Sequence, residues 1–357
     1  MNNRILVTGG AGFIGSNFIR YILTNTADTY IVNLDLLTYA GSLENLRTIV
    51  PTERYKFIKG DIRDQALVEN ILSAYKIDTI VNFAAETHVD RSILNPDTFI
   101  TTNINGTFSL LEASRKIWLD GNDDIITRFH HVSTDEVFGA LEPNELAFNE
   151  TTPYNPNSPY SASKASSDHL VRAYNRTYGL PISISNCSNN YGRFQFPEKL
   201  IPLIILNALQ NKPLPIYGDG KQIRDWIYVE DHCDAIWKII TKGKSGETYV
   251  VGAGNQPTNL EIVKMICDIL DEELNLPKEE SRNNLIKFVT DRPGHDRRYA
   301  MDIRKINKDL DWYPKHEISG GLKKTVKWYL HSIDWVNKIQ KQDQYGAWIT
   351  KNYEERK

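Results

Sequence analysis

The chain has few cysteines, little net charge and no long apolar segment. Its three cysteines, at 187, 233 and 267, are far apart and show no CxxC spacing, so a disulfide framework or a zinc site is not expected. The 42 basic and 45 acidic residues leave a net charge of −3, which gives no indication of a nucleic-acid or membrane-surface protein. No run reaches the ~18 apolar residues of a membrane span, and the N-terminus lacks the apolar region of a secretory signal. We expect a cytoplasmic protein without a metal ion.

The first half alternates short β-branched apolar runs with segments of helical period, a pattern typical of βαβ units and a parallel sheet. It predicts strands at 4–8, 30–34, 56–59, 79–83, 128–133 and 181–185, and helices near 13–25, 64–75, 97–118 and 160–178. The predicted fold is α/β, with a doubly wound parallel sheet of the Rossmann type over residues 1–186. Residues 187–357 are predicted to form a smaller α/β substrate-binding domain. Sheets of this type bind ligands at the carboxyl ends of their strands.

Closely spaced glycines follow the first predicted strand and open the first helix. Gly9, Gly12 and Gly15 allow a tight turn and let backbone N–H groups approach a pyrophosphate. Asp35 ends the second strand 20 residues after Gly15, where a carboxylate accepts hydrogen bonds from ribose hydroxyls and repels a 2′-phosphate. The pattern predicts an NAD site.

Tyr160 and Lys164 are four residues apart in a predicted helix and therefore share one face. A positive charge about 5 Å from a phenol, at an effective dielectric of ~20, lowers its pKa by roughly 2.4. We expect Lys164 and oxidised nicotinamide together to make Tyr160 a usable base near neutral pH.

These motifs resemble the extended short-chain dehydrogenase/reductase family, whose members act on nucleotide sugars, and the resemblance covers nearly the whole chain. It implies that Tyr160 is the base for a sugar hydroxyl and that Lys164 orients the ribose, with Ser133 or Thr134 completing the hydrogen bonding. It also implies that the segment near 225–250 returns to the cofactor domain. The implied cofactor residues are Gly9, Gly12, Phe13, Ile14, Gly15, Asp35, Leu36, Thr38, Asp61, Ile62, Phe83, Ala84, Ala85, Thr102, Ser133, Tyr160, Lys164 and Asn190.

Two adjacent carboxyls, Asp135 and Glu136, follow the fifth predicted strand and suit a reaction that needs an additional acid and base. The triplet of Thr134, Asp135 and Glu136, with the segments 37–46, 85–92 and 291–299, is similar to the dTDP-glucose 4,6-dehydratases of that family. This resemblance implies that dTDP-glucose loses water to give dTDP-4-keto-6-deoxyglucose. Glu136 would then remove the C5 proton and Asp135 would protonate the departing C6 hydroxyl. The alternatives are a dehydratase for another nucleotide sugar and a 4-epimerase, which usually has small or uncharged residues in place of this pair.

The resemblance extends to a nucleotide-sugar pocket in the second half of the chain. The implied substrate residues are Thr87, Thr134, Asn189, Lys199, Leu200, Pro215, Tyr217, Arg224, Asn259, Arg292, His295 and Tyr299. A homodimer is also implied, with helices near 97–118 and 160–178 pairing across a two-fold axis. His130 and His131 are adjacent on a strand and face opposite sides, so core packing is favoured for both over a metal site.

Overall fold

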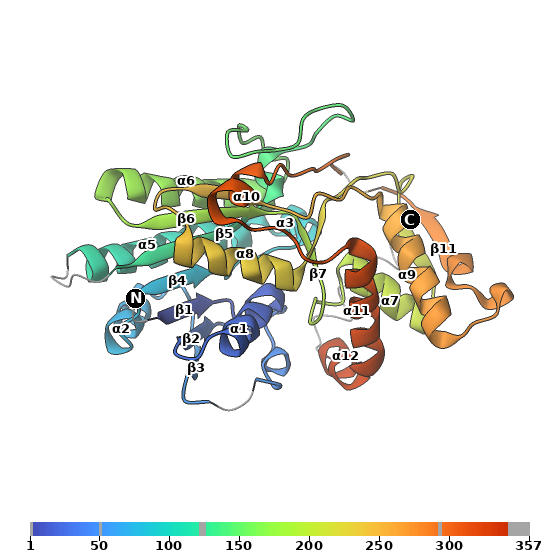
Figure 1. The fold of residues 1–357 in the computed structure, drawn as a ribbon, viewed down its shortest axis with the longest axis horizontal. Coiled ribbons are helices and arrows are strands. Elements are labelled where there is room, and N and C mark those ends of the chain that lie inside the picture. The colour runs from blue at the N-terminus through green and yellow to red at the C-terminus, as the bar shows by residue number, and fades with distance from the viewer. Residues whose placement is uncertain (1–2, 50–51, 121–125, 292–294, 342–357) are drawn as a thin grey trace.

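A seven-stranded parallel sheet forms the centre of the computed structural model, which describes residues 3–49, 52–120, 126–291 and 295–341 (Figure 1). The strands are β1 (Arg4–Thr8), β2 (Tyr30–Asp35), β3 (Tyr55–Lys59), β4 (Thr79–Asn82), β5 (Arg128–Thr134), β6 (Ile182–Cys187) and β10 (Thr248–Val251). Their order is β10-β6-β5-β4-β1-β2-β3, with every neighbouring pair parallel. The strand order reverses between β1 and β4, which is where such sheets open a ligand crevice at their carboxyl ends.

Helices cover both faces of the sheet and bury its apolar strands. On one face α1 (Phe13–Asn25) packs against α8 (Val229–Lys242), and both contribute to an apolar cluster with β1 and β2. On the other face α2 (Gln65–Ala74), α5 (Gly106–Ser114) and α6 (Pro159–Tyr178) share a second cluster with the strands (Figure 1). The predicted doubly wound α/β fold is therefore confirmed, and the six predicted strands agree with the structure to within two residues at each end.

The predicted helix over 97–118 differs from the observed structure. It is divided into α4 (Pro96–Phe99), a π-helical turn at Ile100–Asn105, α5, and a second π-helical turn at Arg115–Leu119. The first wide turn contains the buried Asn103, whose Nδ2 donates to the Glu86 carbonyl at 3.0 Å and whose Oδ1 accepts from the Glu86 N–H at 2.8 Å. Wide turns of this kind are frequent at functional sites, and this one fixes the loop that follows β4.

A second lobe packs around its own apolar cluster, which includes Ile204, Ile266 and Leu322. Its helices are α7 (Leu200–Leu209), α9 (Asn259–Leu274), α11 (Ile318–His331) and α12 (Ile333–Gln340). Two small parallel sheets pair β7 (Asn189–Tyr191) with β9 (Trp226–Tyr228) and β8 (Leu214–Tyr217) with β11 (Ile286–Val289). The remaining helices are α3 (Val89–Leu94) and α10 (Arg304–Leu310).

The chain crosses between the two lobes more than once. Strand β10 pairs with β6, and α8 packs on α1, although both follow the first elements of the second lobe in sequence. We infer that the segment near 225–250 belongs with the cofactor-binding half, and the division at residue 186 stays a prediction.

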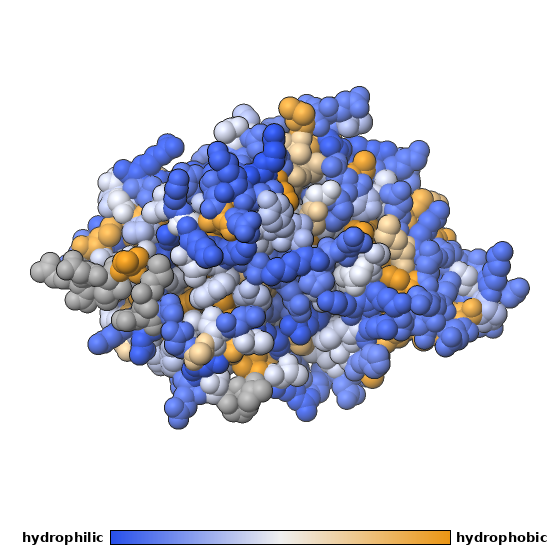
Figure 2. Space-filling model, in the orientation of Figure 1, coloured by the Kyte–Doolittle hydropathy of each residue, from blue (hydrophilic) through white to orange (hydrophobic). Residues whose placement is uncertain are grey.

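Polar and charged residues dominate the face seen in Figure 2, where apolar residues form only small patches. Within the described parts of the chain, none of the helices combines the length and apolar character needed to cross a membrane.

Candidate active site

A cavity of about 450 Å³ opens at the carboxyl ends of the central strands and is lined by residues of both lobes. All eighteen predicted cofactor residues and the five predicted catalytic residues line it. Of the predicted substrate residues, the lining includes Thr87, Thr134, Asn189, Lys199, Leu200, Pro215, Tyr217, Arg224, Asn259 and His295. Tyr299 does not line the cavity. The centre of its buried ring lies 4.3 Å from Cζ of Arg224. Arg292 falls outside the described residues.

The glycine loop between β1 and α1 forms one end of this cavity. A Cβ on Gly9, which has φ of +68°, would lie 2.7 Å from the Ala84 backbone nitrogen, and one on Gly15 would lie 2.4 Å from the Gly9 carbonyl oxygen. No side chain caps the first turn of α1, so its backbone N–H groups stay available to an anion. The loop therefore fits the diphosphate of a dinucleotide.

Asp35 ends β2 beside this loop and is largely buried. Its two oxygens accept backbone N–H bonds from Ala11 at 2.8 Å and Leu37 at 2.7 Å, which hold the carboxylate at the cavity wall. Burial raises its pKa, and these two bonds oppose the rise. A carboxylate fixed here fits the ribose hydroxyls of NAD and disfavours a 2′-phosphate.

Tyr160 and Lys164 reach the cavity from the first turns of α6. Ser158 caps this helix through a capping box with Ser161, which fixes where the helix begins and so where Tyr160 stands. Lys164 Nζ donates to the Val132 carbonyl at 2.9 Å, and the Thr134 hydroxyl hydrogen-bonds the Tyr160 phenol.

The hydroxyls of Ser133 and Thr134 take different partners, although sequence alone left both open as partners of the sugar hydroxyl. Ser133 Oγ donates to Asp168 Oδ2 at 3.0 Å. Thr134 Oγ1 donates to Asp135 Oδ1 at 3.2 Å and accepts from the Glu136 N–H at 3.3 Å. Of the two hydroxyls, Thr134 is the one that acts on the pKa of the Tyr160 phenol.

In the chain alone the pKa of Tyr160 is raised, whereas the lowering expected from sequence depends on Lys164 and oxidised nicotinamide together. Burial, followed by the Glu136 carboxylate, raises it well above the usual tyrosine value, and the Thr134 hydrogen bond opposes the rise. Burial also lowers the pKa of Lys164, and Asp168 opposes that change. The chain by itself keeps the phenol protonated, so a positive charge in addition to that of Lys164 is needed to make it a base.

Asp135 and Glu136 stand at the end of β5 on the same cavity wall. Asp135 is 2% exposed, and burial raises its pKa well above the usual aspartate value, with the Glu136 charge adding to the rise and the Arg224 charge opposing it. A carboxyl with a raised pKa is an acid near neutral pH. Within the described residues, no group of three or more His, Cys, Asp or Glu side chains is arranged to hold a metal ion.

Comparison with known proteins gives a consistent set of relatives. A family model described as GDP-mannose 4,6 dehydratase matches residues 6–325. The chain is 55% identical to the dTDP-glucose 4,6-dehydratase of Salmonella typhimurium over 363 residues, with 99% of each chain covered. It is also 55% identical to that of Neisseria meningitidis, with 94% of this chain and 96% of the relative covered.

The chain belongs to the dTDP-glucose 4,6-dehydratase family.

Solved structures of the family have the same fold. The dTDP-glucose 4,6-dehydratase of Bacillus anthracis, solved in complex with NAD, is 44% identical with a TM-score of 0.84, covering 94% of this chain and 99% of that one. The Streptomyces venezuelae enzyme, also with NAD bound, is 42% identical with a TM-score of 0.85 and the same coverage. A UDP-glucose 4-epimerase from Thermotoga maritima is more distant in sequence at 28% identity, with a TM-score of 0.80 over 92% of this chain and 99% of that one. The fold is thus shared with epimerases, whereas the higher identities are to dehydratases.

The charged pair of Arg91 and Glu198 was not predicted from the sequence, although Thr87 and Lys199 next to them in the chain were assigned to the substrate pocket. Glu198, almost fully buried just before α7, accepts from Arg91 Nη2 at 2.9 Å, and the Arg91 guanidinium lies 4.0 Å from the centre of the Tyr39 ring. Lys199 Nζ donates to the Thr87 carbonyl at 3.1 Å. These contacts join the segments around 39, 87–91 and 198–199, which are distant in sequence, so spacing along the chain gave no signal for them.

Proposed function

We propose that the chain converts dTDP-glucose to dTDP-4-keto-6-deoxyglucose and water, with NAD as its bound cofactor. The observation that carries this proposal is the pair of carboxyls, Asp135 and Glu136, in one cavity with Tyr160 and Lys164. A 4-epimerase needs the Tyr/Lys pair alone, whereas loss of water needs a further acid and base. The identity to curated dehydratases supports the same choice.

Residues of the glycine loop and Asp35 would hold NAD, as the geometry of both fits the dinucleotide. When bound, NAD supplies the reversible removal of hydride from the sugar and a positive charge beside Tyr160 in addition to that of Lys164. Tyr160 would take the C4 hydroxyl proton, and the Thr134 hydroxyl would hold the oxygen from which it leaves. The C4 ketone formed in this step acidifies the hydrogen on C5.

Glu136 and Asp135 would then share the elimination. Glu136 removes the C5 proton, and the protonated Asp135 delivers its proton to the C6 oxygen as it departs as water. The raised pKa of Asp135, caused by burial and then by Glu136, supports the acid role. Glu136 returns the C5 proton when hydride comes back to C6, so the cycle is redox-neutral overall.

Mass spectrometry of the purified protein with dTDP-glucose and with UDP-glucose tests this function. We expect dTDP-glucose to lose one water while the NAD content of the protein stays constant. An unchanged mass with altered C4 stereochemistry would instead identify an epimerase. Loss of water from UDP-glucose at a higher rate would identify a dehydratase for another nucleotide sugar.

We also propose a homodimer in which the helices near 97–118 and 160–178 pair across a two-fold axis, with α3 extending the first of them into one helical run that includes α5. Leu94, Ile100 and Phe108 on this run are each about half exposed, at 57%, 49% and 47%. Large apolar side chains left on one helical run are typical of a surface that another chain covers, and a second copy of this chain is the partner that the family resemblance implies. A cytoplasmic location likewise stays a prediction.

A further inference from the structure

Helix α6 carries a row of polar side chains that continues beyond the catalytic pair. Tyr160, Lys164, Asp168 and Arg172 are four residues apart and therefore lie on one face. Asp168 is fully buried, where a carboxylate is costly unless it is paired and hydrogen-bonded. The reaction described above gives it no role.

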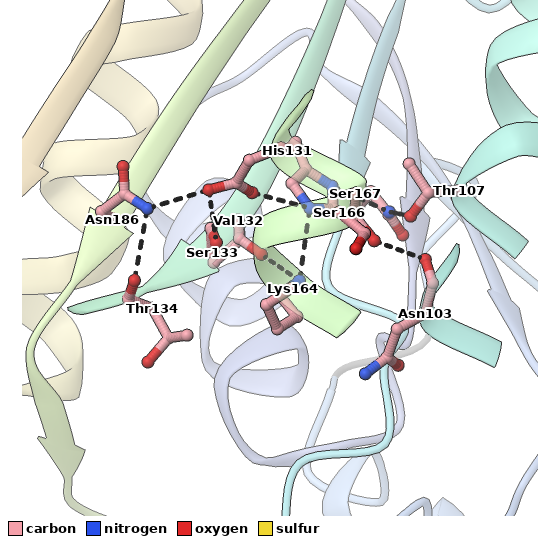
Figure 3. A network of polar contacts seen from close by, with 12 residues as sticks. Asn103, Thr107, His131, Val132, Ser133, Thr134, Lys164, Ser166, Ser167 and Asn186 are labelled. Carbon is pink, nitrogen blue, oxygen red and sulfur yellow. Dashed lines mark hydrogen bonds and ion pairs between the residues drawn. The ribbon is translucent and has the colours of Figure 1, made fainter. Parts of the chain in front are cut away.

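One oxygen of Asp168 is held by three donors. Oδ2 accepts from the Ser133 hydroxyl at 3.0 Å, the Tyr154 hydroxyl at 2.7 Å and Asn186 Nδ2 at 3.1 Å. Asn186 Nδ2 also donates to the Thr134 carbonyl at 3.2 Å, so this network reaches the end of β5 (Figure 3). These bonds fix the carboxylate and direct its other oxygen.

The other oxygen, Oδ1, has no hydrogen bond in the described structure and faces His131 Nε2 at 3.4 Å. The same ring nitrogen lies 3.3 Å from Lys164 Nζ, which also donates to the Val132 carbonyl. The edge of the imidazole thus stands between a buried carboxylate and a buried ammonium, and Figure 3 shows His131 beside Lys164.

The hydrogen-bond network decides which ring nitrogen of His131 carries the hydrogen. The Thr8 hydroxyl donates to Asn82 Oδ1 at 2.6 Å, and this orients Asn82 Nδ2 towards His131 Nδ1 at 3.2 Å. Nδ1 is therefore an acceptor, and Nε2 carries the hydrogen. An Nε2–H group cannot accept from Lys164, whose hydrogens remain for Val132 and the cavity. It faces Asp168 Oδ1 at 3.4 Å without a hydrogen bond.

We propose that Asp168 is a positioning residue of the active site: it is the buried counter-charge of Lys164, held at a distance by the neutral ring of His131. A direct ion pair would draw the ammonium away from the cavity. A separated carboxylate stabilises the ammonium without taking its hydrogens. Because the charge of Lys164 favours the phenolate of Tyr160, this inference rests on the proposed function.

The charges around the pair agree with this arrangement. Burial, and then the Lys164 charge, lowers the pKa of His131 well below its usual value, so the ring is neutral. Burial lowers the pKa of Lys164, and Asp168 provides the opposing effect. Other titratable or charged groups on the packed elements are His130 with a pKa of about 3, Cys187 with a pKa of about 12, Tyr154 with a raised pKa, Tyr160, Arg172, Asp135 and Glu136.

The test compares Asp168→Asn with Tyr154→Phe. Asparagine keeps a similar shape and removes the charge, whereas phenylalanine removes one hydrogen bond to Oδ2 and keeps the charge. The readout is the pH dependence of single-turnover reduction of bound NAD by dTDP-glucose, followed by absorbance, with KM and thermal unfolding measured in parallel. Its acid limb reports deprotonation of Tyr160.

We expect the acid limb of Asp168→Asn to move up by about one pH unit, so the rate on that limb falls about tenfold, with KM changed less than about threefold. The direction in which the acid limb moves tests the proposal. If Lys164 kept its proton without Asp168, removal of a negative charge would lower the pKa of Tyr160 and move the limb down. An unmoved or lowered limb in folded Asp168→Asn, or an equal upward move in Tyr154→Phe, would overturn the proposal.

His131→Gln provides a second measurement that remains if Asp168→Asn does not fold. Glutamine replaces a neutral side chain and leaves the Asp168 charge, so we expect a slower turnover with the acid limb within about 0.3 pH units of the unsubstituted chain. A limb raised by a full unit would contradict the counter-charge. All variants are compared with the unsubstituted chain, so absence of product from that chain would refute the proposed function separately.

Discussion

Asp135 and Glu136 are neighbours in the chain, yet their surroundings differ. Asp135 is almost fully buried, while Glu136 is only partly so. Burial disfavours a charged carboxyl, and a second carboxylate beside it adds to the effect. The pair is therefore suited to hold one proton, on Asp135, and this difference gives two identical functional groups two roles.

Replacement of Glu136 by glutamine separates oxidation from loss of water. Glutamine cannot accept the C5 proton, so we expect NAD reduction by dTDP-glucose to remain detectable while product formation falls by about 100-fold or more. Absorbance follows the first step and mass spectrometry the second. Glu279→Gln, on an exposed turn, is the matched control and should retain both steps. Unimpaired loss of water in Glu136→Gln would refute the assignment of the base.

The raised pKa of Asp135 also makes a prediction about stability. Because burial raises this pKa in the folded state, the folded chain binds the proton more tightly than the unfolded chain, and stability is lost as pH rises from ~4 towards the folded pKa. Asparagine carries no such cost. We expect Asp135→Asn to raise the unfolding temperature by roughly 1–3 °C at pH 8 and to give little gain near pH 4.

Thermal unfolding at the two pH values measures this, with the exposed Asp120→Asn as control. An equal gain at both pH values would show that titration is not the cause. Activity should be lost at either pH, since asparagine has no proton to deliver.

At the scale of single elements, the turn from β1 into α1 depends on the absence of side chains. An alanine Cβ at Gly15 would lie 2.4 Å from the Gly9 carbonyl oxygen, so the backbone of the loop must move. We expect Gly15→Ala to reduce the NAD content of the purified protein by about tenfold or more, since the loop N–H groups then miss the diphosphate.

Gly320→Ala in α11 is the control for that substitution, because nothing lies within 4 Å of the added Cβ. It should keep its NAD and gain stability slightly, as alanine favours a helix over glycine. NAD released by denaturation and quantified by absorbance measures both variants. Full NAD content in Gly15→Ala would contradict the role of the loop.

Local sequence patterns were sufficient to predict most of the fold and much of the site. Most of the strands were predictable because they contain short apolar runs that the parallel sheet buries on both faces, and the glycine loop because its spacing has a steric cause. The π-helical turn at Ile100–Asn105 was not predictable, since an apolar period of 3.6 does not show where a turn widens.

Contacts between residues that are distant in sequence were the second feature that the sequence could not predict. Sequence reasoning assigned His131 to core packing, and the side chain is indeed buried. Its position between Lys164 and Asp168 depends on the register of β5 against α6, which no spacing along the chain reveals. The Arg91–Glu198 pair was missed for the same reason, because the two residues are separated by most of the first lobe.

For the whole molecule, the half-exposed apolar side chains on the α3–α5 run predict the assembly state. Phe108→Glu places a charge on the surface of the proposed dimer contact, and we expect light scattering to show the monomer mass where the unsubstituted chain shows twice that mass. Leu146→Glu is the control, since Leu146 is 89% exposed on a loop after β5 and should leave the mass unchanged. A monomeric unsubstituted chain would refute the dimer.

The sheet is completed by a strand that the chain supplies late. Residues 1–186 form six of the seven strands. Strand β10 and the covering helix α8 come later in the sequence, after the first elements of the second lobe. A fragment ending at 186 would expose β6 as an open edge and bare the apolar side of α1. The lobes are consequently not independent domains. In a chimaera joined at residue 186, β10 and α8 would come from a different protein than the sheet that they complete.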